Sequence, residues 1–114
     1  MEKTAPCIHQ ARAFQNEGRF LAAADLLLKA FREEPADGEI ARELGLVVHA
    51  TGDFDTALHY LLRAHHSDPA DEATLAGLLQ VLQDQGRHHE AAHLLLAGVQ
   101  AGANPDDIAN RVAA

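Results

Sequence analysis

The sequence of 114 residues has little of what many small folds depend on: one cysteine, no tryptophan and 4% aromatic residues. With Cys7 alone, an intrachain disulfide and a zinc site built on several cysteines are both excluded. Basic residues are also scarce, 9 against 17 acidic ones, and the net charge is −8. Because a phosphate backbone or an anionic membrane attracts a basic surface, we expect no nucleic acid and no membrane as partner.

Long apolar runs are absent as well. No stretch is long enough to span a membrane, and the first residues lack the apolar segment typical of a secretion signal. We therefore expect a cytoplasmic protein. Hydrophobic residues still make up 47% of the chain, with Ala and Leu dominant, which favours closely packed helices.

What the sequence does contain is a period of 34 residues, seen first in the spacing of three glycines. Several alanines and leucines keep the same spacing. The sets are Gly18, Gly52 and Gly86; Ala23, Ala57 and Ala91; Leu27, Leu61 and Leu95; and Leu28, Leu62 and Leu96. A fixed period of this length indicates a stack of similar supersecondary units rather than one globular core.

Within each unit the pattern predicts two helices, the first ending at a glycine and the second ending before a proline turn. Four residues lie where a helix N-cap is expected, namely Asp37, Asp53, Asp71 and Asn104. The predicted helices span residues 5–17, 20–33, 38–51, 54–67, 72–85 and 88–100, with a short terminal helix within 105–113.

These residues resemble a tetratricopeptide repeat (TPR) array of three units, 4–37, 38–71 and 72–105, in a single domain. The middle unit carries the clearest match: Leu44-Gly45 in the first helix, Gly52-Asp53-Phe54 in the turn, and Ala57, Leu61 and Ala64 in the second helix. The third unit departs most from the pattern, with Leu79 in place of a small residue, His88 in place of the turn aromatic and Gly98 in place of an alanine.

The resemblance implies an all-α fold, a right-handed superhelical stack of three TPR-like helix-turn-helix hairpins plus a short C-terminal capping helix. It also implies that the first helix of each unit lines a concave groove that binds a peptide or helix of another protein. Carried over by matching position, the groove residues are Ile8, Arg12, Gln15, Glu39, Arg42, Glu43, Leu46, His49, Ala76, Gln80 and Gln83. Arginine and amide groups can hydrogen-bond a peptide backbone, while Ile8 and Leu46 can take an apolar side chain. The alternative is that these residues form ordinary solvated faces.

One class of TPR partner is not expected. TPR domains that grip a C-terminal carboxylate use Lys, Asn and Arg at set groove positions. The matching positions here carry Ile8, Arg12, Glu43, Ala73 and Gly77. Because Glu43 would repel a carboxylate, recognition of a partner by its acidic C-terminus is disfavoured.

We therefore expect a protein-interaction adaptor or scaffold that has no cofactor and is not an enzyme. Two alternatives stay open: a small TPR chaperone for a specific client, and an assembly protein that forms homo-oligomers. The assembly alternative uses a ladder of apolar residues on the second helices, Leu28, Leu62 and Leu96 with Tyr60. Such a ladder is either core or an exposed patch, and we favour core packing.

One motif has to be weighed against the repeat. His89-Glu90-Ala91-Ala92-His93 matches the H-E-x-x-H signature of zinc metalloproteases. The repeat already explains Glu90 and Ala91, and no strand is predicted to form a substrate cleft. We therefore expect no metal cofactor, with His89 and His93 as at most an adventitious metal site. His59 shares the offset of His93, and we interpret these histidines as part of a polar outer face.

Overall fold

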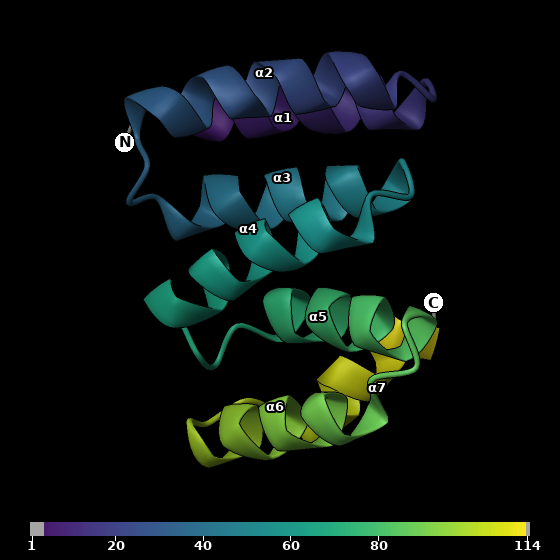
Figure 1. The fold of residues 1–114 in the computed structure, drawn as a ribbon. Helices are drawn as coiled ribbons and strands as arrows, with labels where there is room; N and C mark the ends of the chain where they lie inside the picture. Colours follow the sequence, from purple (N-terminus) through teal and green to yellow (C-terminus); the bar gives the residue numbers. More distant parts are fainter. Residues whose placement is uncertain (1–3, 114) are drawn as a thin grey trace.

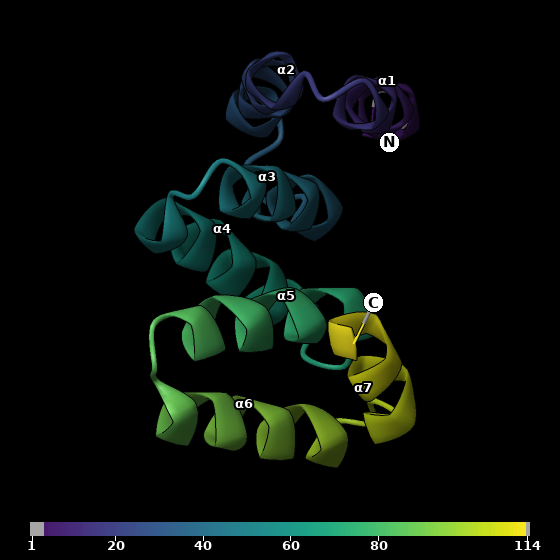
Figure 2. The same cartoon turned by 90° about the vertical axis from the view of Figure 1, so that its right-hand side faces the viewer.

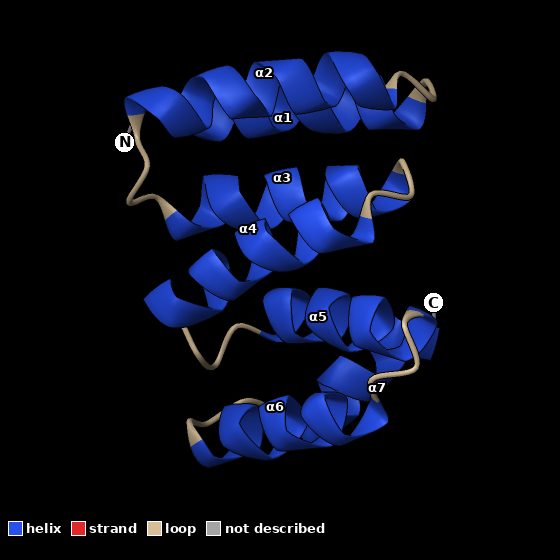
Figure 3. Cartoon of the chain, in the orientation of Figure 1, coloured by secondary structure: helices blue, strands red, loops and turns tan. Residues whose placement is uncertain are grey.

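A computed structural model describes residues 4–113 as seven α-helices joined by short turns, with no strand in that range (Figures 1 and 3). The helices are α1 Thr4–Asn16, α2 Phe20–Glu33, α3 Gly38–Ala50, α4 Phe54–Ser67, α5 Glu72–Asp84, α6 His88–Gln100 and α7 Pro105–Ala113. The all-helical prediction is confirmed, and α1, α3 and α5 each end one residue before the predicted end. None of the helices in residues 4–113 is both long and apolar enough to cross a membrane.

The glycine turns close the first helix of every hairpin in the same way. Gly18, Gly52 and Gly86 have φ of +77°, +89° and +72°, a left-handed conformation that residues with a Cβ rarely adopt. The residue after each glycine donates its N–H to a carbonyl five positions back, at 2.8 to 3.4 Å. This bond satisfies a carbonyl that the helix end would otherwise leave unpaired.

Side-chain caps begin three of the four helices for which they were predicted. Asp37 accepts hydrogen bonds from the backbone N–H of residues 39 and 40, Asp53 from residue 56, and Asn104 from residues 106 and 107. Asp71 lies at the predicted N-cap position of α5, but its side chain does not make the cap hydrogen bonds that Asp37 and Asp53 make. Its carboxylate instead accepts from the Arg42 guanidinium and the Thr74 hydroxyl.

The hairpins stack so that each first helix packs on the second helix before it: α3 packs on α2, and α5 packs on α4. In Figure 2, α1 and α3 lie to the right of α2 and α4, and α7 lies on the same side as α1 and α3. The buried residues form three apolar clusters along the stack, each drawn from neighbouring helices. The molecule therefore has a layered core, as expected for a repeat array.

Glycine allows the tight contact at the centre of the stack. Leu61 of α4 is fully buried between Gly45 of α3 and Gly77 of α5. A Cβ on Gly45 would lie 2.6 Å from Cγ of Leu61, and a Cβ on Gly77 would lie 3.4 Å from both of its methyl groups. The two glycines thus let three helices meet around one leucine side chain.

The last helix does not follow the stacking of the earlier ones. Ile108 of α7 has the same offset as Ile40 and Thr74, and all three are 1% exposed, so α7 is in register with the first helix of a unit. It packs on α5, however, where Ile108 and Val112 join a core with Leu75. The predicted terminal helix is present, and it covers the concave side of the third hairpin.

The predicted leucine ladder is split between core and surface. Leu28 and Tyr60 are partly buried against the first apolar cluster, as core packing requires. Leu62 and Leu96 are 41% and 57% exposed, so the prediction that they pack in the core is wrong. Residues at this offset lie on the outer side of the second helix, which faces away from the next hairpin. Only in the first unit do neighbouring side chains partly bury the leucine.

We expect Gly45→Ala to lower the free energy of unfolding by about 1–3 kcal/mol, because overpacking at Leu61 outweighs the gain of about 1 kcal/mol in helix propensity. Urea unfolding at 25 °C measures the change. The control is Ala50→Gly at the exposed end of the same helix, which should cost about 1 kcal/mol or less from propensity alone. A Gly45→Ala protein more stable than the wild type would show that the close contact is not a constraint.

Candidate functional site

A hollow of about 340 Å³ lies where α1, α3, α5 and α7 face one another. We call it the groove. Its lining residues are Arg12, Gln15, Arg42, Glu43, Leu46, Asp71, Ala73 and Arg111. Five of them were predicted as groove residues from the sequence, and the structure brings these five together.

Ion pairs run across the floor of the groove and join three hairpins. The Arg42 guanidinium donates to a Glu43 carboxylate oxygen at 3.2 Å and to Asp71 Oδ2 at 3.1 Å. The other Glu43 oxygen accepts from Nε of Arg12 at 3.1 Å. Arg12 belongs to α1, Arg42 and Glu43 to α3, and Asp71 immediately precedes α5, so this network connects the three first helices.

Burial makes this pairing necessary. The Glu43 side chain is 7% exposed and that of Arg42 is 17% exposed, and an unpaired charge at such depth would be costly. Burial by itself lowers the pKa of Arg42, but the hydrogen bond and charge of Asp71, together with Glu43, more than offset it and the pKa is raised. Both the arginines and the carboxylates of the network are therefore charged, and the sum of their charges is close to zero.

The pKa of Asp71 depends on the same two opposing effects, burial and pairing. Burial raises its pKa, but hydrogen bonds from Thr74 and Arg42 and the Arg42 charge outweigh that effect, so the pKa lies below its ordinary value. The Thr74 hydroxyl donates to Asp71 Oδ2 at 2.6 Å from the first turn of α5. Thr74 is 1% exposed, so this bond also satisfies a buried polar group.

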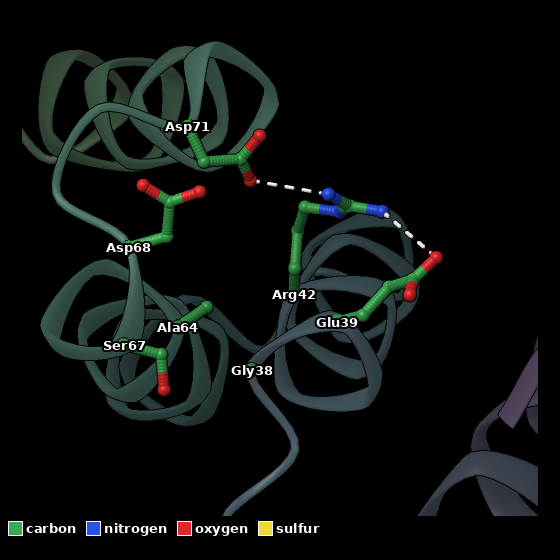
Figure 4. Close-up of a pocket in the computed structure, with 7 residues that line it drawn as sticks. All are labelled: Gly38, Glu39, Arg42, Ala64, Ser67, Asp68 and Asp71. Atoms are coloured by element: carbon green, nitrogen blue, oxygen red, sulfur yellow. Dashed lines mark hydrogen bonds and ion pairs between the residues drawn. The ribbon is translucent and has the colours of Figure 1, made fainter. Parts of the chain in front are cut away.

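A second pocket lies on the other side of the Arg42–Asp71 pair, between the start of α3, the end of α4 and the start of α5 (Figure 4). Its volume is about 310 Å³. Figure 4 shows the Arg42 guanidinium between Asp71 and Glu39, whose nearest oxygen is 3.7 Å from Nη2. Because both hollows share Arg42 and Asp71, the pair forms a wall between the groove and this outer pocket.

His49 joins α3 to α5 at the opposite end of the two helices. Its Nε2 atom lies 3.0 Å from Oδ2 of Asp84, and its ring lies 5.5 Å from that of Phe54. The predicted groove residue His49 is thus placed by a partner on the next hairpin. It does not line the groove hollow, and Glu39 and Gln80 do not line it either.

Two predicted groove residues are buried, and the prediction for them is wrong. Ile8 is 3% exposed and packs with the first apolar cluster, while Ala76 is 6% exposed. They share their offset with Arg42, so this position points into the stack in all three units. Gln83 is exposed, but it lines a different hollow on the other side of α7.

The set of predicted partner-binding residues missed Asp71 and Arg111, and it left out Ala73, which was placed at a groove position without being assigned a contact. Arg111 has the same offset as Glu43, so the repeat period contained the signal once α7 is counted as a first helix. The role assigned to Glu43 also needs correction. Because Arg12 and Arg42 hold both of its oxygens, Glu43 presents no free negative charge that would repel a carboxylate.

The histidines of the H-E-x-x-H motif lie on the surface of α6. His89 and His93 are both exposed, and Glu90 is bound to Arg87 at 2.6 Å rather than turned toward them. Over residues 4–113, no group of three or more His, Cys, Asp and Glu side chains is placed to hold a metal ion.

We expect Asp71→Asn to lower the free energy of unfolding at pH 7 by about 1–2 kcal/mol, because it removes the carboxylate that accepts from Arg42 and Thr74. Since the folded pKa lies below the ordinary value, the contribution is present at neutral pH and is lost as the pH falls below about 4. Urea unfolding between pH 7 and pH 3 should show the deficit of the variant shrinking with acid. Asp25→Asn, at an exposed site, should stay within about 0.5 kcal/mol of wild type throughout. A deficit that is the same at pH 3 would contradict the assignment.

Comparison with known proteins bears on the fold. No family model matches the sequence, and no curated protein matches it. Among solved structures, it is similar to the type III secretion chaperone SycD of Yersinia enterocolitica in complex with a peptide of the translocator YopD. The TM-score is 0.83 at 18% identity, over 99% of this chain and 88% of that one.

The Sgt2 TPR domain from Aspergillus fumigatus is similar with a TM-score of 0.84 at 17% identity, over 99% of this chain and 76% of that one. A mutant of MamA gives a TM-score of 0.75 at 17% identity, over 91% of this chain and 76% of that one. At such identities the likeness concerns the fold. This chain therefore has a TPR-like fold.

Proposed function

We propose that this chain is a protein-interaction module that holds a peptide or short helix of a partner in the groove. The observation that carries the proposal is the ion network on the groove floor, which fixes α1, α3 and α5 relative to one another. A surface that is already ordered loses little conformational entropy when a partner binds. SycD, which has the same fold, was solved with a bound peptide, and this supports the proposal.

The groove offers a peptide polar contacts around one apolar position. The carboxylates of Glu43 and Asp71 are occupied by arginines, whereas Arg12 keeps 53% of its side chain exposed. Gln15 and Leu46 are partly exposed, and exposed Arg111 makes no ion pair within residues 4–113. We infer that Arg12, Arg111 and Gln15 hydrogen-bond the partner and that Leu46 contacts an apolar side chain.

Three other predicted residues fit the edges of the same surface. Glu39 lines the outer pocket, and His49 and Gln80 follow along α3 and α5 beyond the hollow. We propose that a longer bound segment contacts these three, but not Gln83, which lies on the other side of α7. In this proposal the protein acts in the cytoplasm, without cofactor or catalysis, as an adaptor, or as a chaperone if its client depends on it for solubility.

The test is a quantitative pull-down from the native host with a Gln15→Glu, Arg111→Glu variant as bait. Arg12 and Arg42 are left intact, because a glutamate at either position would place a further carboxylate next to buried Glu43 and disrupt the fold. We expect recovery of the partner to fall about 10-fold or more, since a reversed charge and a lost amide act at the centre of the surface. The matched control is Arg32→Glu, Gln100→Glu, at exposed sites on the second helices. Equal recovery by both variants would place binding outside the groove.

A second candidate function is self-association, which the exposure of Leu62 and Leu96 favours. These leucines share an offset on neighbouring second helices, so they form one apolar edge. We expect Leu62→Gln, Leu96→Gln to leave the fold intact and to reduce any concentration-dependent dimer seen by sedimentation velocity. A wild-type protein that is monomeric at about 100 μM would exclude this candidate, because an association weaker than that contributes little in solution.

A further inference from the structure

A leucine on the third hairpin lacks the cover that its counterparts have. Leu27, Leu61 and Leu95 share one offset on the second helices, and the first two are fully buried. Leu27 packs with Leu44 of α3, and Leu61 packs against Gly77 of α5, so the next first helix covers each of them. Leu95 remains partly exposed.

Two features accompany the exposure of Leu95. Leu79 occupies the offset of Ala11 and Gly45, the small residues that face the second helix in the other two hairpins. Leu79 is larger than either of them, and with Leu95 it lines the space between α5 and α6. In addition, α7 packs on α5 rather than on α6, so it does not take the place that α3 and α5 take in the layers above.

The result is an apolar hollow between α5, α6 and α7, which we call the end cleft. It consists of two adjoining spaces of about 320 and 250 Å³ that share Leu79, Gln83 and Leu95. The remaining lining residues are His88, Ala91, Ala92, Pro105, Ile108, Ala109 and Val112. These volumes lie near the lower end of the range for ligand pockets, so the cleft has room for a few side chains.

Acidic residues adjoin the end cleft. Exposed Asp106 and Asp107 lie in the chain between the cleft residues Pro105 and Ile108 at the start of α7, whereas the carboxylate of Asp84, next to Gln83, is paired with His49. The nearest arginine, Arg87, is held by Glu90 at 2.6 and 2.9 Å. Arg111 lines the groove on the other side of α7. An acidic rim attracts a basic partner and repels a second copy of this chain, whose net charge is −8.

We propose that the end cleft binds an amphipathic α-helix of a partner protein, with an apolar stripe flanked by lysines or arginines. The chain itself provides the model for this contact, because the equivalent surfaces of α2 and α4 are each covered by a helix. The apolar stripe covers Leu79, Leu95 and Val112, and the basic flank meets the acidic rim. This site is separate from the groove, so the module presents two surfaces.

The test is a titration of the full chain, followed by NMR of backbone amides, with a synthetic helical peptide of about 15 residues that carries a leucine–alanine stripe between lysines. We expect saturable shifts centred on Leu79, Gln83 and Leu95. A peptide with glutamate in place of lysine should bind about 10-fold more weakly or not at all, since it meets the acidic rim.

Two variants locate the binding. Ala92→Lys fills the mouth of the end cleft from an exposed position and should weaken the peptide at least about 10-fold, whereas Ala97→Lys, exposed on the same helix outside the cleft, should leave binding unchanged. Three results would overturn the proposal: no saturable binding, equal affinity of wild type and Ala92→Lys, or shifts centred on Arg12 and Leu46. A dimer of the chain alone that Ala92→Lys dissociates would also overturn it, because the occupant would then be a second copy.

Discussion

The rest of the structure depends on how closely two helices can approach across a buried leucine. In the second hairpin the leucine is Leu61, and glycine on both adjoining helices lets α3, α4 and α5 meet around it. The first hairpin meets the same requirement with Ala11 beside Leu27, both fully buried. Since each unit buries its apolar face only on its neighbours, this contact fixes where the next hairpin lies and therefore how the first helices line the groove.

The groove floor meets a different constraint, the cost of burying charge. Glu43 is almost completely buried, and it is tolerated because Arg12 and Arg42 approach it from two helices. The same arginine reaches Asp71, so one guanidinium connects the second and third hairpins. Its pairs add little as isolated surface contacts, but a shared, partly buried network fixes the positions of three helices together. Of the polar residues that determine the groove's shape, Arg42, Glu43 and Asp71 are therefore occupied within the network, and Arg12 alone keeps half of its side chain exposed for a partner.

This distinction shows what could be predicted from the sequence. The helices and their ends followed from glycines, prolines and caps, whose effects are local. The faces of the helices were harder to predict. Ile8, Arg42 and Ala76 share an inward-facing offset, and only the length of the Arg42 side chain brings its charged end to the groove. Asp71 was predicted as a cap because its position fits one. Its carboxylate instead accepts a hydrogen bond from the guanidinium of Arg42, which lies 29 residues earlier in the chain. Reasoning from the local sequence does not reveal such a contact.

The departures of the third unit from the repeat pattern are physically linked. A Cβ on Gly98 would lie 2.4 Å from Cδ1 of Leu75, so the glycine lets α6 close tightly at that end of α5. One turn further along α5 lies Leu79, which lines both spaces of the end cleft. Leu79 and Gly98, two of the residues by which the third unit departs from the TPR pattern, thus lie on the hairpin that has the end cleft.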